Sequence, residues 1–167
     1  VVGVGGGHDL WAALIHDASY VKGVELNQQI IDAHFEFGPD YSHDLITTST
    51  IEFVHAEGRS ELMRDRQRYD VVQMSGVDTW TALTSGAYVL AENYLYTVEA
   101  IEAAYESLKP DGLLHITRFA AQMEALRMIA NLRAAFEKLG HEQWRDSLIC
   151  LQTNDGLMTF IVKKEPF

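Results

Sequence analysis

An apolar stretch in the middle of the chain ends in a short polar loop with a single acid. The stretch reads YDVVQMSGVDTW over residues 69–80, and its apolar run stops at Ser75. In open α/β sheets ligands bind at the carboxyl ends of the strands, so Asp78 in this loop is a candidate general base. An aspartate before Thr79 and Trp80 is equally well explained as the N-cap of a helix, and the residues leave both interpretations open.

Three other predicted strand ends carry residues that suit a nucleoside. The chain begins VVGVGGG, in which Gly3, Gly5 and Gly7 let the backbone turn tightly and approach a ligand, with a helix N-terminus behind. The next strand is predicted to end at Glu25, whose carboxylate can accept hydrogen bonds from ribose hydroxyls. The third strand is followed by residues 56–58 (AEG), where an adenine edge would lie.

A dinucleotide site is the main alternative for a glycine run at a strand end. Dinucleotide sites typically carry the motif G-x-G-x-x-G. The third glycine would fall at His8 when counting starts from Gly3, and at Leu10 when it starts from Gly5. Both registers fail, so the run G-x-G-x-G does not favour a NAD cofactor.

Alternating strands and helices are predicted to position these strand ends. The strands are expected within residues 1–7, 20–26, 51–56, 70–75, 108–117, 143–152 and 157–163, and the helices within 8–16, 28–37, 58–68, 92–108 and 120–139. This order predicts an α/β fold with a mostly parallel seven-stranded sheet, helices on both faces and a C-terminal antiparallel hairpin. No repeat or low-complexity linker interrupts it, so residues 1–167 are expected to form one domain.

The composition limits the class of protein. With 47% hydrophobic residues the chain can bury a core, and no apolar run approaches the ~18 residues that a membrane helix needs. The single cysteine, Cys150, suits a reducing cytoplasm, and its apolar neighbours predict a core position. A net charge of −11 disfavours nucleic-acid binding and suits a cationic substrate, although solubility alone also explains it. Neither metal-ligand spacing nor G-x-S-x-G is present, so we expect no metal and no hydrolase.

The glycine run, the acid after the second strand, the LKPDG turn before the fifth strand and the final hairpin resemble the class I S-adenosylmethionine-dependent methyltransferase superfamily. Within it the chain is most similar to spermidine synthases. VVGVGGG resembles their nucleoside loop, GVELN with Glu25 and Leu26 their ribose-binding strand end, and HAEGRSEL with Glu57 and Gly58 their adenine-side segment. The resemblance implies a Rossmann-like fold that binds S-adenosylmethionine or decarboxylated S-adenosylmethionine, with Ser75 beside the ligand.

The chain departs from the spermidine synthases after the fourth strand. Their motif resembles DSSDP and the chain reads SGVDT, so Ser75 stands where the family has the aspartate that activates the attacking amine, and Asp78 stands at the second aspartate. An unassisted serine hydroxyl cannot serve as that base near neutral pH. The family's N-terminal β-hairpin domain is missing and the chain starts without Met, so we expect a piece of a longer protein.

Three functions fit this interpretation. The first is aminopropyl transfer to an amine, such as a cationic polyamine, with Asp78 facing the acceptor. The second is methyl transfer to a small molecule, which depends mainly on proximity and therefore tolerates Ser75. The third is a catalytically silent nucleoside-binding domain. The resemblance also implies a homo-oligomer, although related enzymes form theirs through the part that this chain lacks.

Overall fold

A computed structural model of the chain describes residues 1–41, 45, 47–66, 68–77, 94–119, 122–154 and 156–167. The strands are β1 (Val21–Glu25), β2 (Ile51–His55), β3 (Tyr69–Ser75), β4 (Leu108–Phe119), β5 (Leu148–Gln152) and β6 (Leu157–Lys163). The helices are α1 (His8–Ile15), α2 (Gln28–Tyr41), α3 (Gly58–Arg64), α5 (Val98–Ser107) and α6 (Gln122–Lys138), with short 3₁₀ turns η1 (Tyr94–Tyr96) and η2 (Trp144–Ser147).

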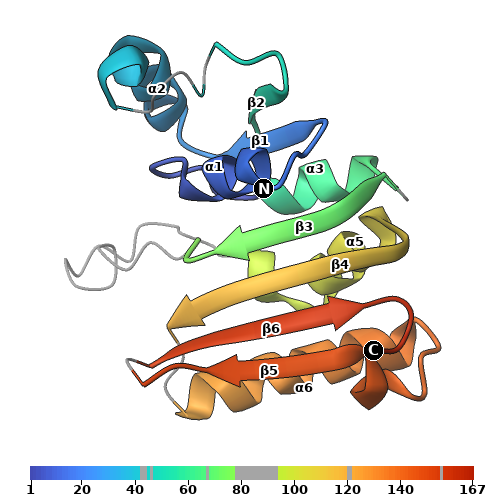
Figure 1. Cartoon of the computed structure of the whole chain (residues 1–167). Helices are drawn as coiled ribbons and strands as arrows, with labels where there is room; N and C mark the ends of the chain where they lie inside the picture. Colours follow the sequence, from blue (N-terminus) through green and yellow to red (C-terminus); the bar gives the residue numbers. More distant parts are fainter. Residues whose placement is uncertain (42–44, 46, 67, 78–93, 120–121, 155) are drawn as a thin grey trace.

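The described strands form two sheets (Figure 1). β1 and β2 pair in parallel, and the second sheet has the order β3–β4–β6–β5. In that sheet β3 and β4 are parallel, whereas β6 runs antiparallel to both of its neighbours. The α/β class and the C-terminal antiparallel hairpin are therefore confirmed. The prediction of one mostly parallel seven-stranded sheet is wrong, because the described strands divide into a pair and a mixed group of four.

The first residues of the chain, predicted as a strand, form the connection between the two sheets. Val2 donates its N–H to the carbonyl of Gln73 in β3 at 2.9 Å, and Gly3 donates to Val24 in β1 at 2.8 Å. Val2 and Val24 form only an isolated bridge. Gly3 ends the extended segment because its φ of 79° lies outside the β region. The segment is thus too short to count as a seventh strand.

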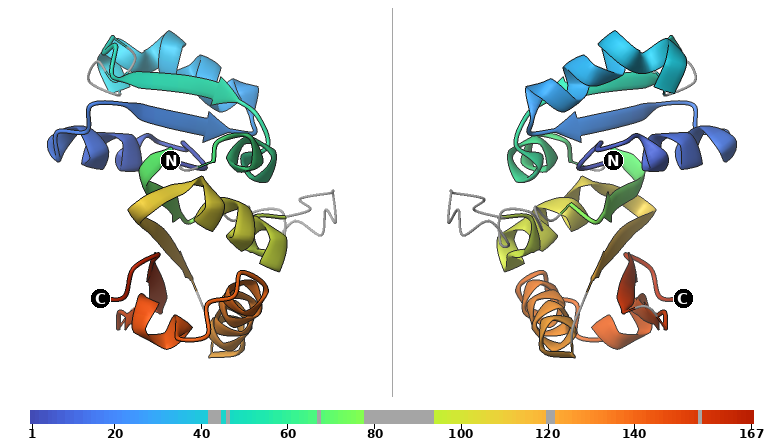
Figure 2. Two further views of the ribbon diagram at one scale, coloured as in Figure 1. Left: turned by 90° about the vertical axis from the view of Figure 1, so that its right-hand side faces the viewer. Right: turned by 90° about the vertical axis from the view of Figure 1, so that its left-hand side faces the viewer.

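Helices lie on both sides of the strands. Figure 2 shows α1 on one side and α3, α5 and α6 on the other. α2 continues to Tyr41, past the Gly38-Pro39-Asp40 sequence that predicts its end. The helix expected within residues 92–108 is described as η1 and α5, separated by Thr97, whose hydroxyl accepts the N–H of Ala100 at 3.2 Å as an N-cap.

Alternation along the strands builds the main core between the four-stranded sheet and helices α5 and α6. Met74, Ile116 and Phe160, from three neighbouring strands, are fully buried, and so are Leu132 and Phe136 of α6. A smaller cluster lies around α1 and β1 and contains Val4, Leu10, Val21 and Leu45. The first cluster fixes the position of β3, and the second supports the segment around Val4.

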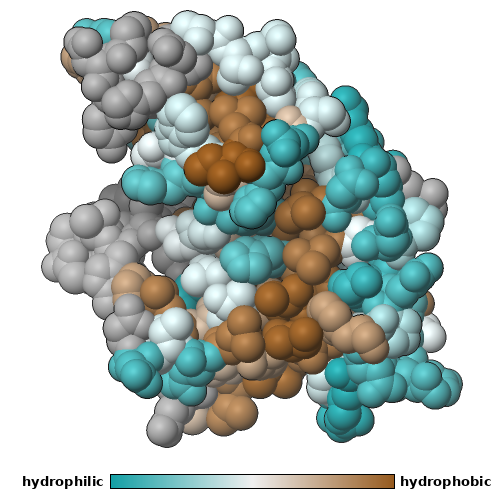
Figure 3. Space-filling view, in the orientation of Figure 1, coloured by the Kyte–Doolittle hydropathy of each residue, from teal (hydrophilic) through white to brown (hydrophobic). Residues whose placement is uncertain are grey.

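The face of the four-stranded sheet that points away from α5 and α6 is partly open. Val71, Ile149 and Leu151 lie on this face and remain exposed, and Figure 3 shows apolar side chains across it. Cys150 is paired with Phe160 and points to the other face, yet it is exposed too, so its predicted core position is wrong. The reason is that β5 is the edge strand of the sheet, so that its apolar sequence is not enclosed.

We expect Phe136→Ala to lower the free energy of unfolding by roughly 3–5 kcal/mol. The ring is 1% exposed and packs against Tyr105, His141 and Trp144, so its loss leaves a cavity. Urea titration followed by circular dichroism measures the change. Phe37→Ala is the matched control, because Phe37 is 56% exposed, and it should cost less than about 1 kcal/mol. Equal losses in both variants would contradict this core.

Candidate functional site

A cleft of about 540 Å³ opens at the carboxyl ends of β1, β2 and β3. Its lining comes from residues 2–6, 8–9, 24–27, 30, 56–58, 75–77 and 94–95. The cleft brings together most of the residues that the sequence predicts for a nucleoside site: Gly3, Gly5, Glu25, Leu26, Glu57, Gly58 and Ser75. These residues come from four separate segments, whose strand ends meet where the two sheets are joined by the first residues of the chain.

The glycine loop, defined as residues 3–7, forms one wall of this cleft. A Cβ on Gly3 would lie 2.7 Å from Cγ1 of Val77, and φ is 79°, so no other residue fits without strain. Gly7, predicted as a ligand contact, is the last residue of the loop and lies outside the lining. It precedes α1 as its N-cap, with a φ of 84°, and a Cβ there would lie 2.7 Å from Cδ1 of Leu45. Gly7 therefore allows Leu45 to pack closely against the end of the loop.

Glu25 holds the glycine loop against the end of β1. Its side chain is buried, and Oε2 accepts the N–H groups of Val4 at 3.0 Å and Gly5 at 3.2 Å. Oε1 accepts the N–H of Asn27 at 3.0 Å. A carboxylate oxygen can accept two hydrogen bonds, so Oε1 retains capacity for a ligand hydroxyl. Glu25 thus stabilises the glycine loop and also lines the cleft.

Glu57 lines the cleft and also caps helix α3. Its carboxylate accepts the N–H groups of Arg59 at 2.9 Å and Ser60 at 2.8 Å, together with the hydroxyl of Ser60 at 2.7 Å. Burial opposes ionisation of Glu57, but these hydrogen bonds outweigh it and lower the pKa of the carboxyl group. Glu57 therefore presents a charged carboxylate whose orientation is fixed by the helix it caps.

Ser75 ends β3 at the floor of the cleft, where its hydroxyl accepts a hydrogen bond from Nε2 of Gln73 at 3.3 Å. The chain then turns at Gly76, which has a φ of 60°. Asp78, the candidate base, lies outside the described residues, as do Trp80 and Glu92. Its role therefore remains a prediction from the sequence.

Several lining residues were not singled out from the sequence. They are Gly6, His8, Asp9, Ile30, Val77 and Leu95. His8 and Asp9 directly follow the glycine run and begin α1, so the sequence could have indicated them as cleft residues. Leu95 and Ile30 had no such signal, because their apolar spacing equally indicates core positions.

The described lining of the cleft carries carboxylates without matching cations. Asp9, Glu25 and Glu57 contribute three acids, and none of the lining residues that the structure describes is a lysine or arginine. The sequence contains neither residue between Lys22 and Arg59, nor between residues 68 and 109. Such a cleft favours a positively charged ligand over an anionic one.

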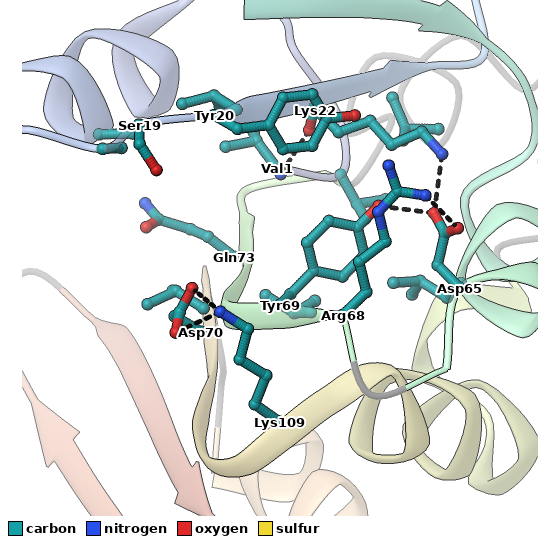
Figure 4. Close-up of a pocket in the computed structure, with 18 of the residues that line it drawn as sticks. Val1, Ser19, Tyr20, Lys22, Asp65, Arg68, Tyr69, Asp70, Gln73 and Lys109 are labelled. Atoms are coloured by element: carbon teal, nitrogen blue, oxygen red, sulfur yellow. Dashed lines mark hydrogen bonds and ion pairs between the residues drawn. The ribbon is translucent and has the colours of Figure 1, made fainter. Parts of the chain in front are cut away.

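A second cleft, of about 670 Å³, lies on the other side of Val1, beside β1 and β3 (Figure 4). Lys22, one of the cations in its lining, bonds to Asp65 at 2.7 Å and also to Glu61. The hydroxyl of Tyr69 donates to Asp65 at 2.6 Å. Burial opposes ionisation of Asp65, but the hydrogen bonds from Lys22 and Tyr69 outweigh it and lower the pKa of this carboxyl group. Arg64 and Arg68 also pair with Glu61 and Asp65, so both carboxylates are matched by cations, and we interpret the cluster as a structural junction between β1, α3 and β3.

Two further properties concern the part of the chain that the structure describes. Within it, no three His, Cys, Asp or Glu side chains are grouped closely enough to hold a metal ion. Within the same residues, no helix combines the length and apolar character required to cross a membrane.

Comparisons with known proteins agree with this architecture. No family model matches the sequence, and the search of curated proteins found no match. Among solved structures, spermidine synthase from Thermotoga maritima is similar over 99% of this chain and 53% of its own, with a TM-score of 0.72 and 17% identity. A spermidine synthase in complex with the transition state analogue AdoDATO gives a TM-score of 0.69, 17% identity, and coverage of 99% and 52%. Human methyltransferase-like protein 13 in complex with SAH gives 0.68, 15%, and coverage of 99% and 70%.

The chain has a spermidine-synthase-like, class I methyltransferase fold, as its sequence predicts. These structures are of transferases, and the likeness at 15–17% identity establishes the fold. The chain spans about half the length of the spermidine synthases it matches, at 53% and 52%.

The ion pairs of Lys22 with Asp65 and Glu61 predict that the free energy of unfolding depends on pH. Lys22→Met should lower the free energy of unfolding by about 3 kcal/mol at pH 7, because Asp65 and Glu61 lose their buried cation. The pKa of Asp65 is lowered in the folded state, so its ionised form stabilises the fold above the ordinary pKa of 3.8. That contribution is lost as the pH falls through the lowered pKa. The deficit of the variant should therefore shrink at acid pH.

Urea titrations at pH 7 and at about pH 3 measure the deficit of Lys22→Met. Lys109→Met is the matched control, because Lys109 pairs with the exposed Asp70, and this change should cost less than about 1 kcal/mol at either pH. A deficit for Lys22→Met that is the same at both pH values would refute the proposed coupling to Asp65.

Proposed function

We propose that this chain binds S-adenosylmethionine or its decarboxylated form and transfers a group from it to a small-molecule acceptor. One observation carries the proposal: residues predicted for a nucleoside site converge on a single cleft that has three carboxylates and no lysine or arginine in its described lining. The spermidine-synthase-like fold supports it. A sulfonium compound is cationic, and a cleft of this charge attracts it.

The parts of the cleft suit the parts of such a ligand. The glycine loop lets the backbone approach the nucleoside, with the N-terminus of α1 behind it. Oε1 of Glu25 has acceptor capacity for a ribose hydroxyl. Glu57 and Gly58 would lie along the adenine, and Ser75 would lie near the sulfur. No step in this arrangement calls for a metal ion.

The charge of the cleft favours the decarboxylated ligand. S-adenosylmethionine carries a carboxylate, which would find no lysine or arginine in the described lining. Arg118, at the end of β4, lies outside that lining, and its guanidinium stacks 4.3 Å from the ring centroid of Tyr96. We therefore place aminopropyl transfer to an amine first. An amine acceptor would have to lose a proton, and Asp78 is our candidate for that base.

Methyl transfer is the alternative that a specific residue supports. Ser75 stands where an aspartate activates the amine in the family that the chain resembles, and methyl transfer depends mainly on alignment. The fold is also similar to that of human methyltransferase-like protein 13. The third alternative is a catalytically silent nucleoside-binding domain, and turnover assays distinguish it from both transferases.

Thermal shift with a ligand panel tests the proposal. The panel contains S-adenosylmethionine, its decarboxylated form, S-adenosylhomocysteine, methylthioadenosine and NAD. A ligand at about 100 times its Kd stabilises the fold by about 2.7 kcal/mol, which raises the Tm of a domain of this size by roughly 5–10 °C. We expect the decarboxylated ligand and methylthioadenosine to give the largest shifts. Larger shifts with S-adenosylmethionine and S-adenosylhomocysteine would favour methyl transfer, and no shift with any nucleoside would refute the proposal.

Glu25→Gln connects the panel to the cleft. The amide keeps the shape of the side chain but loses the charge that holds the loop, so we expect Kd to rise by at least about tenfold. Glu137→Gln is the matched control, because the Glu137 side chain of α6 is exposed and pairs with Arg133, and it should leave Kd unchanged. Equal affinity of both variants would place the nucleoside elsewhere.

Asp78→Asn tests the catalytic role that the sequence predicts. If Asp78 accepts the proton of the acceptor amine, the variant should retain nucleoside binding and lose turnover by about 100-fold or more. The measurement is transfer of label from the nucleoside to a panel of amines. Turnover equal to that of the wild type would rule out the role of base and favour the N-cap interpretation.

A further inference from the structure

The glycine loop is held from a second side by His34 of α2. His34 is 4% exposed, and its Nε2 lies 2.9 Å from the carbonyl oxygen of Gly5. A Cβ placed on Gly7 would lie 3.1 Å from Cε1 of His34, so the ring also packs against the end of the loop. His34 therefore contacts two of the loop glycines, although it lies outside the lining of the cleft.

The contact with Gly5 determines which ring nitrogen of His34 carries the proton. A carbonyl oxygen only accepts, so Nε2 must be the donor. Nδ1 is buried and has no hydrogen-bond partner among the described residues. The ring is packed against Phe53, with 5.5 Å between the centroids. His34 thus donates from Nε2 to one described acceptor, the carbonyl of Gly5.

The direction of this carbonyl fixes the direction of the next amide. The described peptide bonds are trans, so the N–H of Gly6 points opposite to the C=O of Gly5. The other N–H groups of the loop already have acceptors. Gly3 and Gly7 donate to the carbonyls of Val24 and Val4, and both Val4 and Gly5 donate to the Glu25 carboxylate. Gly6 lines the cleft, and its N–H has no partner among the described residues. It is the amide of this loop that remains for a ligand.

We propose that His34 is a positioning residue: by holding the carbonyl of Gly5 toward α2, it aims the N–H of Gly6 into the cleft, where this amide donates to an acceptor atom of the bound nucleoside. The inference rests on the proposed nucleoside function and adds to it a donor and the side chain that orients the donor. Glu25 holds the N–H of the Gly5 residue and His34 holds its C=O. The two side chains thus clamp both polar backbone groups of Gly5.

Two substitutions separate hydrogen bonding from packing. His34→Gln places an amide N–H near the position of Nε2 and can still donate to Gly5, whereas His34→Leu fills the space without a donor. We expect the Kd for methylthioadenosine, measured by calorimetry, to change by less than about threefold in His34→Gln and to rise about tenfold in His34→Leu. In ¹H–¹⁵N spectra, the Gly6 amide should shift on ligand binding in the wild type and His34→Gln, and much less in His34→Leu.

His141→Leu controls for a general loss of stability. His141 bonds to the hydroxyl of Tyr105 at 2.9 Å and packs among aromatic rings, but it follows α6, far from the loop in the sequence, and is not in the lining. Its loss should lower the Tm without changing the Kd. If His34→Leu binds as tightly as the wild type, or if His34→Gln is as weak as His34→Leu, the role of the His34 donor is overturned.

A ligand-independent measurement distinguishes failure of this inference from failure of the proposed function. Long-range ¹H–¹⁵N correlation of the histidine rings should show the proton of His34 on Nε2 at neutral pH. A proton on Nδ1 alone would overturn the inference whatever the protein binds. Conversely, a proton on Nε2 in a protein that binds none of the nucleosides would leave the clamp intact and refute the function, and with it the role of Gly6 as a ligand donor.

Discussion

The candidate site depends on one buried carboxylate. Glu25 is 7% exposed at the end of β1, and its charge is satisfied by the backbone N–H groups of Val4, Gly5 and Asn27. A carboxylate without such donors would be costly in this position. The chain after Val2 must therefore fold back over the strand end, and glycines permit the conformations that this requires. The wall of the cleft and the start of α1 follow from that requirement.

The same region joins the two sheets. Val2 and Gly3 bond to β3 and β1, and the cluster of Lys22, Asp65 and Tyr69 links β1 to α3 and β3 on the other side of Val1. The cleft takes its lining from both sheets, so its shape depends on this junction as much as on the residues within it. Stability at the junction and affinity in the cleft are consequently expected to be coupled, although the residues that govern them differ.

Local pattern predicted much of the fold and part of the site. The helices at 8–15, 98–107 and 122–138 follow from apolar spacing, and the residues at the strand ends converge as expected. The division into two sheets was not predictable, because it depends on how far the first residues pair before Gly3 turns. Cys150 was misplaced because apolar spacing does not reveal an edge strand. His34 was missed because its partner, Gly5, is 29 residues away and no local pattern links them.

If the cleft binds a nucleoside as proposed, its charge would also select among adenosine compounds. Many of these compounds, ATP among them, carry phosphates next to the ribose. A phosphate entering this cleft would meet Asp9, Glu25 and Glu57, with no lysine or arginine in the described lining to offset the repulsion. A sulfonium would gain from the same three groups. A nucleoside site with this lining would thus distinguish metabolites that share one adenine ring by the sign of the charge attached to the ribose.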